Sequence, residues 1–264
     1  MHTRRLTIAL LAALMVCIAV AAGWLNSIKG PAGPPCRVTI EDSSYPLSYD
    51  QAQHATTIAL TAKKLQMPNR AVTVAIATAL QESKLENIDY GDRDSVGLFQ
   101  QRPSQGWGTK TQILDPAYAS TRFFQKLAEV SGWQDLTVND AAQAVQRSGH
   151  PTLYEQWETP ARLIARSVSG EEPATLSCQP PEDAPQPANQ QRIAAQLARE
   201  LGSAGIATEL PDQKGWAVSE WLVARAQTAG IKTITFRGQR WSAKDGTWQA
   251  SGANEPIVRI VPIS

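Results

Sequence analysis

The chain has 264 residues, of which 42% are hydrophobic, and its 25 basic and 24 acidic side chains leave a formal net charge of +1. A chain so close to neutral lacks the positive field with which proteins attract nucleic acid, so we expect no nucleic-acid partner. The three histidines, His2, His54 and His150, lie far apart and have no cysteine or acidic neighbour at ligand spacing. We therefore expect neither a metal site nor a cofactor.

The N-terminus predicts a membrane anchor. Residues 1–5 include two arginines, and residues 6–25 form an uncharged apolar stretch of about the length that spans a membrane. Arginines before such a stretch place residues 1–5 in the cytoplasm and the bulk of the chain outside the cell, as in a single-pass signal-anchor protein. One span cannot enclose a transport path, which excludes a transporter. A cleaved signal peptide is the alternative, because Ala19-Val-Ala21 fits a small-residue cleavage site, and the protein would then be secreted.

Two cysteines fall on the predicted extracellular side. Cys36 lies in a linker of residues 26–47 that contains a Gly- and Pro-rich spacer, and Cys178 follows far along the chain. Disulfides persist in extracellular proteins, so the sequence predicts a Cys36–Cys178 disulfide, with two free thiols as the alternative. Closing so long a loop would contribute about 4–5 kcal/mol in the chain-entropy model.

Residues 48–170, which the two cysteines flank, are predicted to form an all-α domain. Apolar residues recur at helical spacing from Ala52 to Leu65, and Asn69 is expected to cap a second helix. Asp115, followed by a proline, and Thr137 are expected to cap two later helices. No stretch of this region alternates convincingly between apolar and polar residues, as a half-buried strand would.

The rest of the chain is predicted to form a linker and a small α/β module, which makes the fold class α+β overall. Residues 171–191 include five prolines, which is typical of a linker. In the module, residues 192–264, Asp245-Gly246 between Trp241 and Trp248 indicates a β-hairpin. The other elements expected there are helices over 192–201 and 216–229 and strands over 231–236 and 257–261.

One acidic residue, Glu82, is placed where a carboxyl can do chemistry. The run from Val72 to Leu80 has no charge, and its apolar residues surround the helix, which predicts a helix buried on all sides. It ends in Gln81-Glu82-Ser83. Burial at the mouth of such a helix removes water from a carboxyl and favours its neutral form, which is the form a general acid needs. A surface glutamate in the last turn of a helix is the alternative.

The Glu82-Ser83 pair after an apolar helix, followed by Gly97-Leu-Phe-Gln100, resembles the lysozyme-like lytic transglycosylases. This family combines a Glu-Ser pair with a later Gly-Leu-Met-Gln, and the resemblance covers residues 36–178. It implies an enzyme of the cell wall that cleaves peptidoglycan glycan strands with Glu82 as its single general acid. The muramic sugar's own hydroxyl would then attack and leave an anhydro product. The C-terminal module is similar to one found in some actinobacterial cell-surface proteins, and its partner is not predicted.

The loop that follows supplies candidate substrate-binding residues. Gly97 would let the backbone approach a sugar, and Gln100 and Gln101 would bond hydroxyls or Glu82 itself. Trp107 would offer a stacking surface for a sugar ring. Anchoring of the loop to neighbouring backbone, and burial of the tryptophan, are the alternatives. With three further candidates, the predicted substrate-binding set is Ser83, Gly97, Phe99, Gln100, Gln101, Trp107 and Tyr154.

The sequence departs from the family in one element. The Ala-Tyr-Asn-Ala-Gly segment that lines the family's cleft is missing, and Ala144-Val-Gln-Arg-Ser148 and then Tyr154 stand in its place. Gln146, Ser148 or Tyr154 would have to substitute. A lysozyme-like module that binds glycan or assembles cell wall without cutting is therefore the alternative function. The acids that could give a second carboxylate, or form only a hydrogen-bonded turn with Arg93, are Asp89, Asp92 and Asp94.

Overall fold

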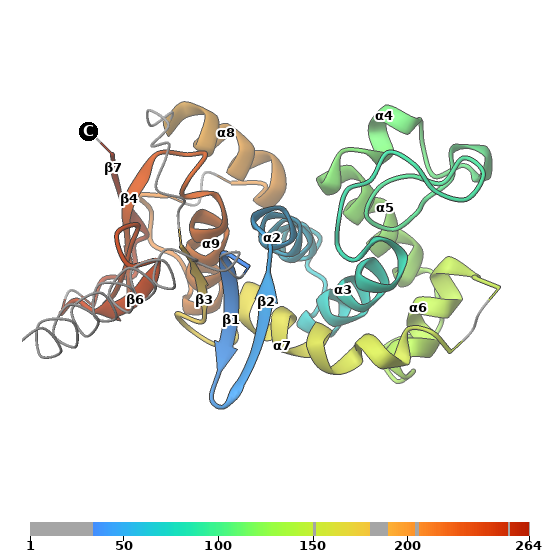
Figure 1. The fold of residues 1–264 in the computed structure, drawn as a ribbon, viewed down its shortest axis with the longest axis horizontal. Helices are drawn as coiled ribbons and strands as arrows, with labels where there is room; N and C mark the ends of the chain where they lie inside the picture. Colours follow the sequence, from blue (N-terminus) through green and yellow to red (C-terminus); the bar gives the residue numbers. More distant parts are fainter. Residues whose placement is uncertain (1–33, 150–151, 180–189, 204–205, 253, 264) are drawn as a thin grey trace, which may run out of the picture. The chain divides into compact units, whose positions relative to one another are not determined.

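The computed structural model describes residues 34–149, 152–179, 190–203, 206–252 and 254–263. The predicted cytoplasmic N-terminus and the predicted anchor, residues 1–5 and 6–25, lie outside the described residues. Within the ranges described, no helix is long and apolar enough to cross a membrane. The chain is an α+β protein, and the elements of residues 34–264 form one unit (Figure 1).

A three-stranded antiparallel sheet forms where the sequence predicts linkers. It has the order β2-β1-β3, with β1 at Cys36–Ile40, β2 at Ser43–Leu47 and β3 at Leu176–Cys178. Successive residues of β1 are alternately buried and exposed, so one face of the strand packs against the core and the other faces solvent. The linkers predicted over 26–47 and 171–191 are therefore wrong where β1, β2 and β3 form. These strands have only three to five residues, too few for a clear pattern beside prolines and glycines.

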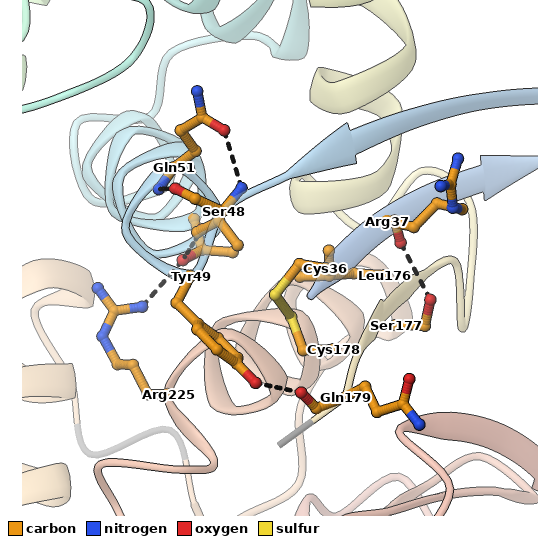
Figure 2. Close-up of a disulfide and its surroundings, with 12 residues drawn as sticks. Cys36, Arg37, Ser48, Tyr49, Gln51, Leu176, Ser177, Cys178, Gln179 and Arg225 are labelled. Carbon is orange, nitrogen blue, oxygen red and sulfur yellow. Dashed lines mark hydrogen bonds between the residues drawn. A yellow bond between two sulfur atoms is a disulfide. The ribbon is translucent and has the colours of Figure 1, made fainter. Parts of the chain in front are cut away.

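The predicted disulfide is confirmed. Cys36 and Cys178 are paired in the register of β1 and β3, and their sulfur atoms are bonded across 142 residues of sequence. Figure 2 shows the bond joining the ends of the two strands, beside Tyr49, whose hydroxyl donates to the backbone oxygen of Gln179. The bond therefore fixes the start of the described chain to the segment that follows the last helix of the N-terminal half.

The helices of the N-terminal half begin largely where local signals predict. They are α2 (Tyr49–Lys64), α3 (Asn69–Ser83), α4 (Lys110–Ile113), α5 (Pro116–Ala128), α6 (Val138–Gln146) and α7 (Glu158–Val168), with short 3-10 helices η1 (Pro103–Gln105) and η2 (Glu155–Trp157). Asp115 accepts hydrogen bonds from the backbone of α5, and Thr137 does so for α6, as predicted. Asn69 is no cap: Pro68 holds the capping position, and the Asn69 amide donates to Glu171 instead.

Helix α3 is the centre of this half, and its predicted burial is confirmed. Every residue from Ala71 to Leu80 is buried. The helix contacts α2, α5, α6 and α7, so neighbours surround it on all sides, and this explains why the run carries no charge. Glu82 lies in the last turn, at the point where the helix leaves the core.

The C-terminal half has two helices and a second sheet. Helices α8 (Gln190–Leu201) and α9 (Asp212–Arg225) precede strands β4 (Ile231–Phe236), β5 (Gln239–Ser242), β6 (Thr247–Ala250) and β7 (Arg259–Pro262). The sheet order is β6-β5-β4-β7, and Trp241 pairs with Trp248 across the predicted hairpin. All its strand pairs are antiparallel, so the predicted α/β character is corrected to α+β in this half as well.

Helix α2 lies between the two halves and contacts α3, α5 and α7 on one side and α8 and α9 on the other (Figure 1). A buried polar network holds this junction. Glu200 accepts hydrogen bonds from the Trp221 indole (2.6 Å) and the Thr57 hydroxyl (2.9 Å), and Arg225 donates to Thr57 (2.6 Å) and Thr56 (2.9 Å). Separating the two halves would leave buried charged groups without partners, which costs free energy. The network therefore holds the two halves together as one core.

Candidate active site

Glu82 is held by the end of α3 in a position that leaves it partly exposed. Lys84 ends the helix with a left-handed backbone (φ 58°), and its N–H donates back to the last turn. The chain therefore turns sharply away two residues after Glu82. One carboxyl oxygen, Oε1, accepts a hydrogen bond of 2.6 Å from the Tyr154 hydroxyl. No other described residue hydrogen-bonds this carboxyl, so its second oxygen is available for a proton.

Tyr154 is fully buried and acts as a fixed donor. It immediately precedes η2, and its backbone N–H donates to the Asn139 side chain on α6 (3.2 Å). Burial, and after it the charge and hydrogen bond of Glu82, raise the pKa of Tyr154 well above its usual value. The phenol therefore keeps its proton and presents it to the carboxyl. The sequence named Tyr154 as a candidate cleft residue, and the structure places it on Glu82.

The loop after α3 is bound to the helix next to Glu82. Ser83 is buried, and its hydroxyl donates to the backbone oxygen of Leu98 (2.8 Å). Val96 and Gln101 exchange backbone hydrogen bonds, which closes a tight turn around Gly97. Gly97 has a φ of 78°, and a Cβ there would lie 2.9 Å from the backbone oxygen of Ile113. This close approach is made to α4, so the structure gives Gly97 a packing role.

The other loop residues also anchor the loop. Phe99 is buried and stacks on Phe123 with 4.7 Å between ring centroids. Gln101 is buried and donates to the backbone oxygen of Ala119 (3.1 Å). Gln100 is partly exposed and donates within its own loop, so among these three it alone presents polar surface to solvent. The substrate-binding roles of Ser83, Phe99 and Gln101 remain predictions, and their contacts in the structure are internal.

The segment that replaces the family's Tyr-Asn element converges on the same place. Gln146 donates to the backbone oxygen of Phe99 (2.7 Å), which ties the end of α6 to the loop. Ser148 donates to Gln143 (3.0 Å) and also contacts the Tyr154 hydroxyl. Of the three candidates for substitution, Tyr154 and Ser148 form one hydrogen-bonded group with Glu82, and Gln146 is bonded to the adjacent loop instead.

The candidate second carboxylates are arranged differently. Asp94 receives hydrogen bonds from Arg102 Nε (2.7 Å) and from the Ser104 backbone (2.8 Å) and hydroxyl (3.0 Å). These bonds, Arg102 first, hold the pKa of Asp94 well below its usual range, so it is an ionised anchor for η1. Asp92 is exposed and lies 3.9 Å from Arg93. The hydrogen-bonded turn is the arrangement found for Asp94, with Arg102 as its cation instead of Arg93.

Four residues that were not predicted as site residues brace the turn that carries Glu82, namely Gln81, Lys84, Gln156 and Trp157. Gln81 accepts hydrogen bonds from the Trp157 indole (2.8 Å) and the Gln156 amide (3.1 Å) on η2. The Lys84 ammonium lies 4.4 Å from the centre of a Trp157 ring. The adjacency of Gln81 to Glu82 was the only signal in the sequence, because η2 lies more than seventy positions away.

Trp107 lies apart from the carboxyl, on a pocket of about 460 Å³ that Gln105 and Gln146 also line. Glu82 is not among the pocket's lining residues. The described residues hold no group of three or more His, Cys, Asp or Glu side chains that could bind a metal ion. The site is thus a tyrosine-bound glutamate at the end of a buried helix, with a rigid loop on one side and a polar pocket beyond it.

No protein-family model matches the chain, and a search of curated proteins found no match to its sequence.

Proposed function

We propose that the protein is a membrane-anchored extracellular lytic transglycosylase that cleaves peptidoglycan glycan strands, with Glu82 as the general acid. The observation that carries the proposal is the Glu82–Tyr154 hydrogen bond at the end of α3. It places a carboxyl at the edge of an apolar core, with one oxygen bound and the other available. The lysozyme-like character of residues 48–170 belongs to the same proposal, and the Ser83–Leu98 link between helix and loop supports it.

The chemistry needs one proton and no second carboxylate. Glu82 gives its proton to the glycosidic oxygen as the bond to the sugar breaks and positive charge develops on the ring. The muramic sugar's own hydroxyl then forms the new bond, and its proton returns to the Glu82 carboxylate. Tyr154 holds the carboxyl in one orientation and stabilises its charged form after the proton has left. Asp94, already bound by Arg102 and Ser104, takes no part.

The Cys36–Cys178 disulfide supports an extracellular location, because such bonds persist in oxidising compartments. The anchor proposed for residues 6–25 would then keep the domain at the membrane surface, facing the wall. In the proposal the partners are glycan strands and, through one N-terminal helix, the membrane.

The second candidate is a module that binds glycan without cutting it. It is favoured by the internal contacts of Ser83, Phe99 and Gln101, which leave few loop side chains to position a substrate.

The deciding experiment incubates the full chain with purified peptidoglycan and analyses the soluble products by mass spectrometry, with Glu82→Gln as the matched control. Anhydro-muramyl ends from the parent alone support the proposal. Reducing ends would mean that water attacks, and Asp92 would become the residue to test. Sedimentation with peptidoglycan but no product from either protein would favour the binding module.

A further inference from the structure

The pocket beside the loop has no role in the chemistry described above. It lies between the turn after η1, the C-terminal part of α5 and the end of α6. Gln146 on its wall donates to the backbone oxygen of Phe99, and Ser83, next to Glu82, donates to the adjacent oxygen of Leu98. Neighbouring carbonyl groups of one loop thus connect the pocket to the candidate active site.

The charges of the pocket leave one arginine unmatched. Lys126 and Glu129 both line it and form an ion pair of 2.8 Å, so they neutralise each other. Arg147 also lines it, and among the residues described no side chain or backbone oxygen pairs with its guanidinium. A guanidinium offers paired donors in a planar fork that matches a carboxylate. The lining therefore carries a net positive charge centred on Arg147.

The backbone supports a role for this side chain. Arg147 ends α6 in the left-handed region, with a φ of 52°. A glycine or an asparagine takes up that conformation at lower cost, so an arginine there is a strained choice at the rim of a pocket.

Trp107 gives the same pocket an aromatic surface. It stands between Gly106 and Gly108, whose φ values are 78° and 134°. Tyr118 donates to the Trp107 backbone oxygen (3.2 Å), and a Cβ at Gly108 would lie 2.5 Å from the Tyr118 hydroxyl. The ring is thus carried by a turn with little freedom to move. Trp107 is partly buried against the hydrophobic core and lines the pocket, and its indole N–H makes no hydrogen bond to a described residue, so it can donate to a ligand.

We propose that this pocket binds a glycan whose sugars carry a substituent with a free carboxylate, with the pyranose ring against Trp107 and the carboxylate of the substituent on Arg147. The inference rests on the proposed function and narrows its substrate. Glycan strands whose lactyl groups carry acidic peptides would bind through both contacts. An uncharged polymer of N-acetylglucosamine would have the ring contact alone.

The test measures binding by calorimetry on the full chain carrying Glu82→Gln, so that the ligands stay intact. The two probes have equal numbers of sugars: a chitin tetramer, and a peptidoglycan tetramer whose muramic residues carry a dipeptide ending in free carboxylates. The peptidoglycan tetramer should bind more tightly. Arg147→Gln should weaken its binding by about tenfold, the size of one hydrogen bond to a charged group, and should leave chitin binding unchanged. Arg147→Lys should recover part of the loss.

Lys126→Gln is the matched control, because it removes a pocket cation that already has a partner. Lys126→Gln should change the ratio of the affinities for the two probes by less than Arg147→Gln does. Equal affinity for the two probes, or an unchanged affinity in Arg147→Gln, would overturn the assignment, as would binding of neither probe. If the parent protein cleaves peptidoglycan but Arg147→Gln does not change the binding affinity, the pocket assignment is refuted while the proposed function stands. Arg147-dependent binding without cleavage would support the pocket and refute the enzyme.

Discussion

Two glutamates on two buried helices differ in what surrounds them. Glu82 ends α3, is partly exposed and accepts a hydrogen bond from Tyr154. Glu220 lies in the middle of α9, is fully buried and accepts a hydrogen bond from the backbone N–H of Thr175 (2.9 Å), just before β3. Burial raises the pKa of Glu220 to about 8, against the opposing effect of that N–H.

The comparison shows that an apolar helix around a glutamate does not by itself make a catalytic acid. Glu220 has the more complete burial, yet α2, α7 and β3 pack against its helix, so no substrate can reach it. Glu82 lies at the helix end, where the chain turns away and one carboxyl oxygen remains available. Position along the helix therefore distinguishes the partly exposed carboxyl of Glu82, which a substrate could reach, from the enclosed carboxyl of Glu220.

The largest effect is expected from the same substitution made at each glutamate. Glu82→Gln keeps shape and most hydrogen bonding but removes the transferable proton, so turnover should fall by about 10²–10⁴-fold, the usual contribution of a general acid. Glu220→Gln should change turnover by less than about twofold, since it lies away from any reacting atom. Both are measured as the release of soluble glycan from peptidoglycan. Equal losses in the two variants would show that the Glu82 effect is only structural.

The second prediction concerns the pH dependence of stability. The pKa of Glu220 is about 8 in the folded protein against 4.5 for a free carboxyl, so below pH 4.5 it is neutral in both states and costs nothing. As pH rises from 4.5 to about 8, only the unfolded chain releases the proton, and stability falls. Glu220→Gln removes this loss. The free energy of unfolding of the variant should therefore exceed that of the parent by a margin that grows over this window to about 4 kcal/mol.

Urea unfolding of both proteins at several pH values measures the difference, in which other titrating groups cancel. A constant difference from pH 4.5 to pH 8 would contradict the burial assigned to Glu220.

Local signals predicted the Glu82 side of this comparison. An uncharged run that is apolar all round is typical of a helix with neighbours on every side, and α3 has them. The Asp115 cap and the Trp241–Trp248 hairpin depend on residues a few positions apart, and both were found.

Apart from the Cys36–Cys178 disulfide, contacts distant in sequence were not predicted. Strand β3 pairs with β1 across 142 residues, and a strand of three residues carries too little pattern to be recognised among prolines. The same holds for the hydrogen bond between Glu220 and the backbone of Thr175, which spans 45 positions. The Tyr154 contact with Glu82 spans 72 positions, so the sequence named the tyrosine as one candidate among three but could not choose it.

The third prediction removes the disulfide that joins β1 to the end of β3. Cys36→Ser with Cys178→Ser should lower the free energy of unfolding by about 4 kcal/mol, because the unfolded chain regains the freedom of a long loop. The β1–β3 hydrogen bonds remain, so the native fold should persist. Thermal unfolding with and without reductant measures the loss. The parent under reductant should match the double variant, and a parent indifferent to reductant would mean that the bond adds no stability.

The smallest effect is expected at Tyr154, and it tests how the Glu82 site works. Tyr154→Phe keeps the buried ring and removes the donor that holds the carboxyl, so turnover should fall by about tenfold, the equivalent of one charge-assisted hydrogen bond. The loss should appear in kcat and leave KM nearly unchanged, because the hydroxyl contacts the carboxyl and not the substrate. Tyr49→Phe is the matched control, since its hydroxyl bonds the backbone of Gln179 beside the disulfide, and its turnover should not change. An unchanged kcat in Tyr154→Phe would show that the tyrosine is only a packing residue.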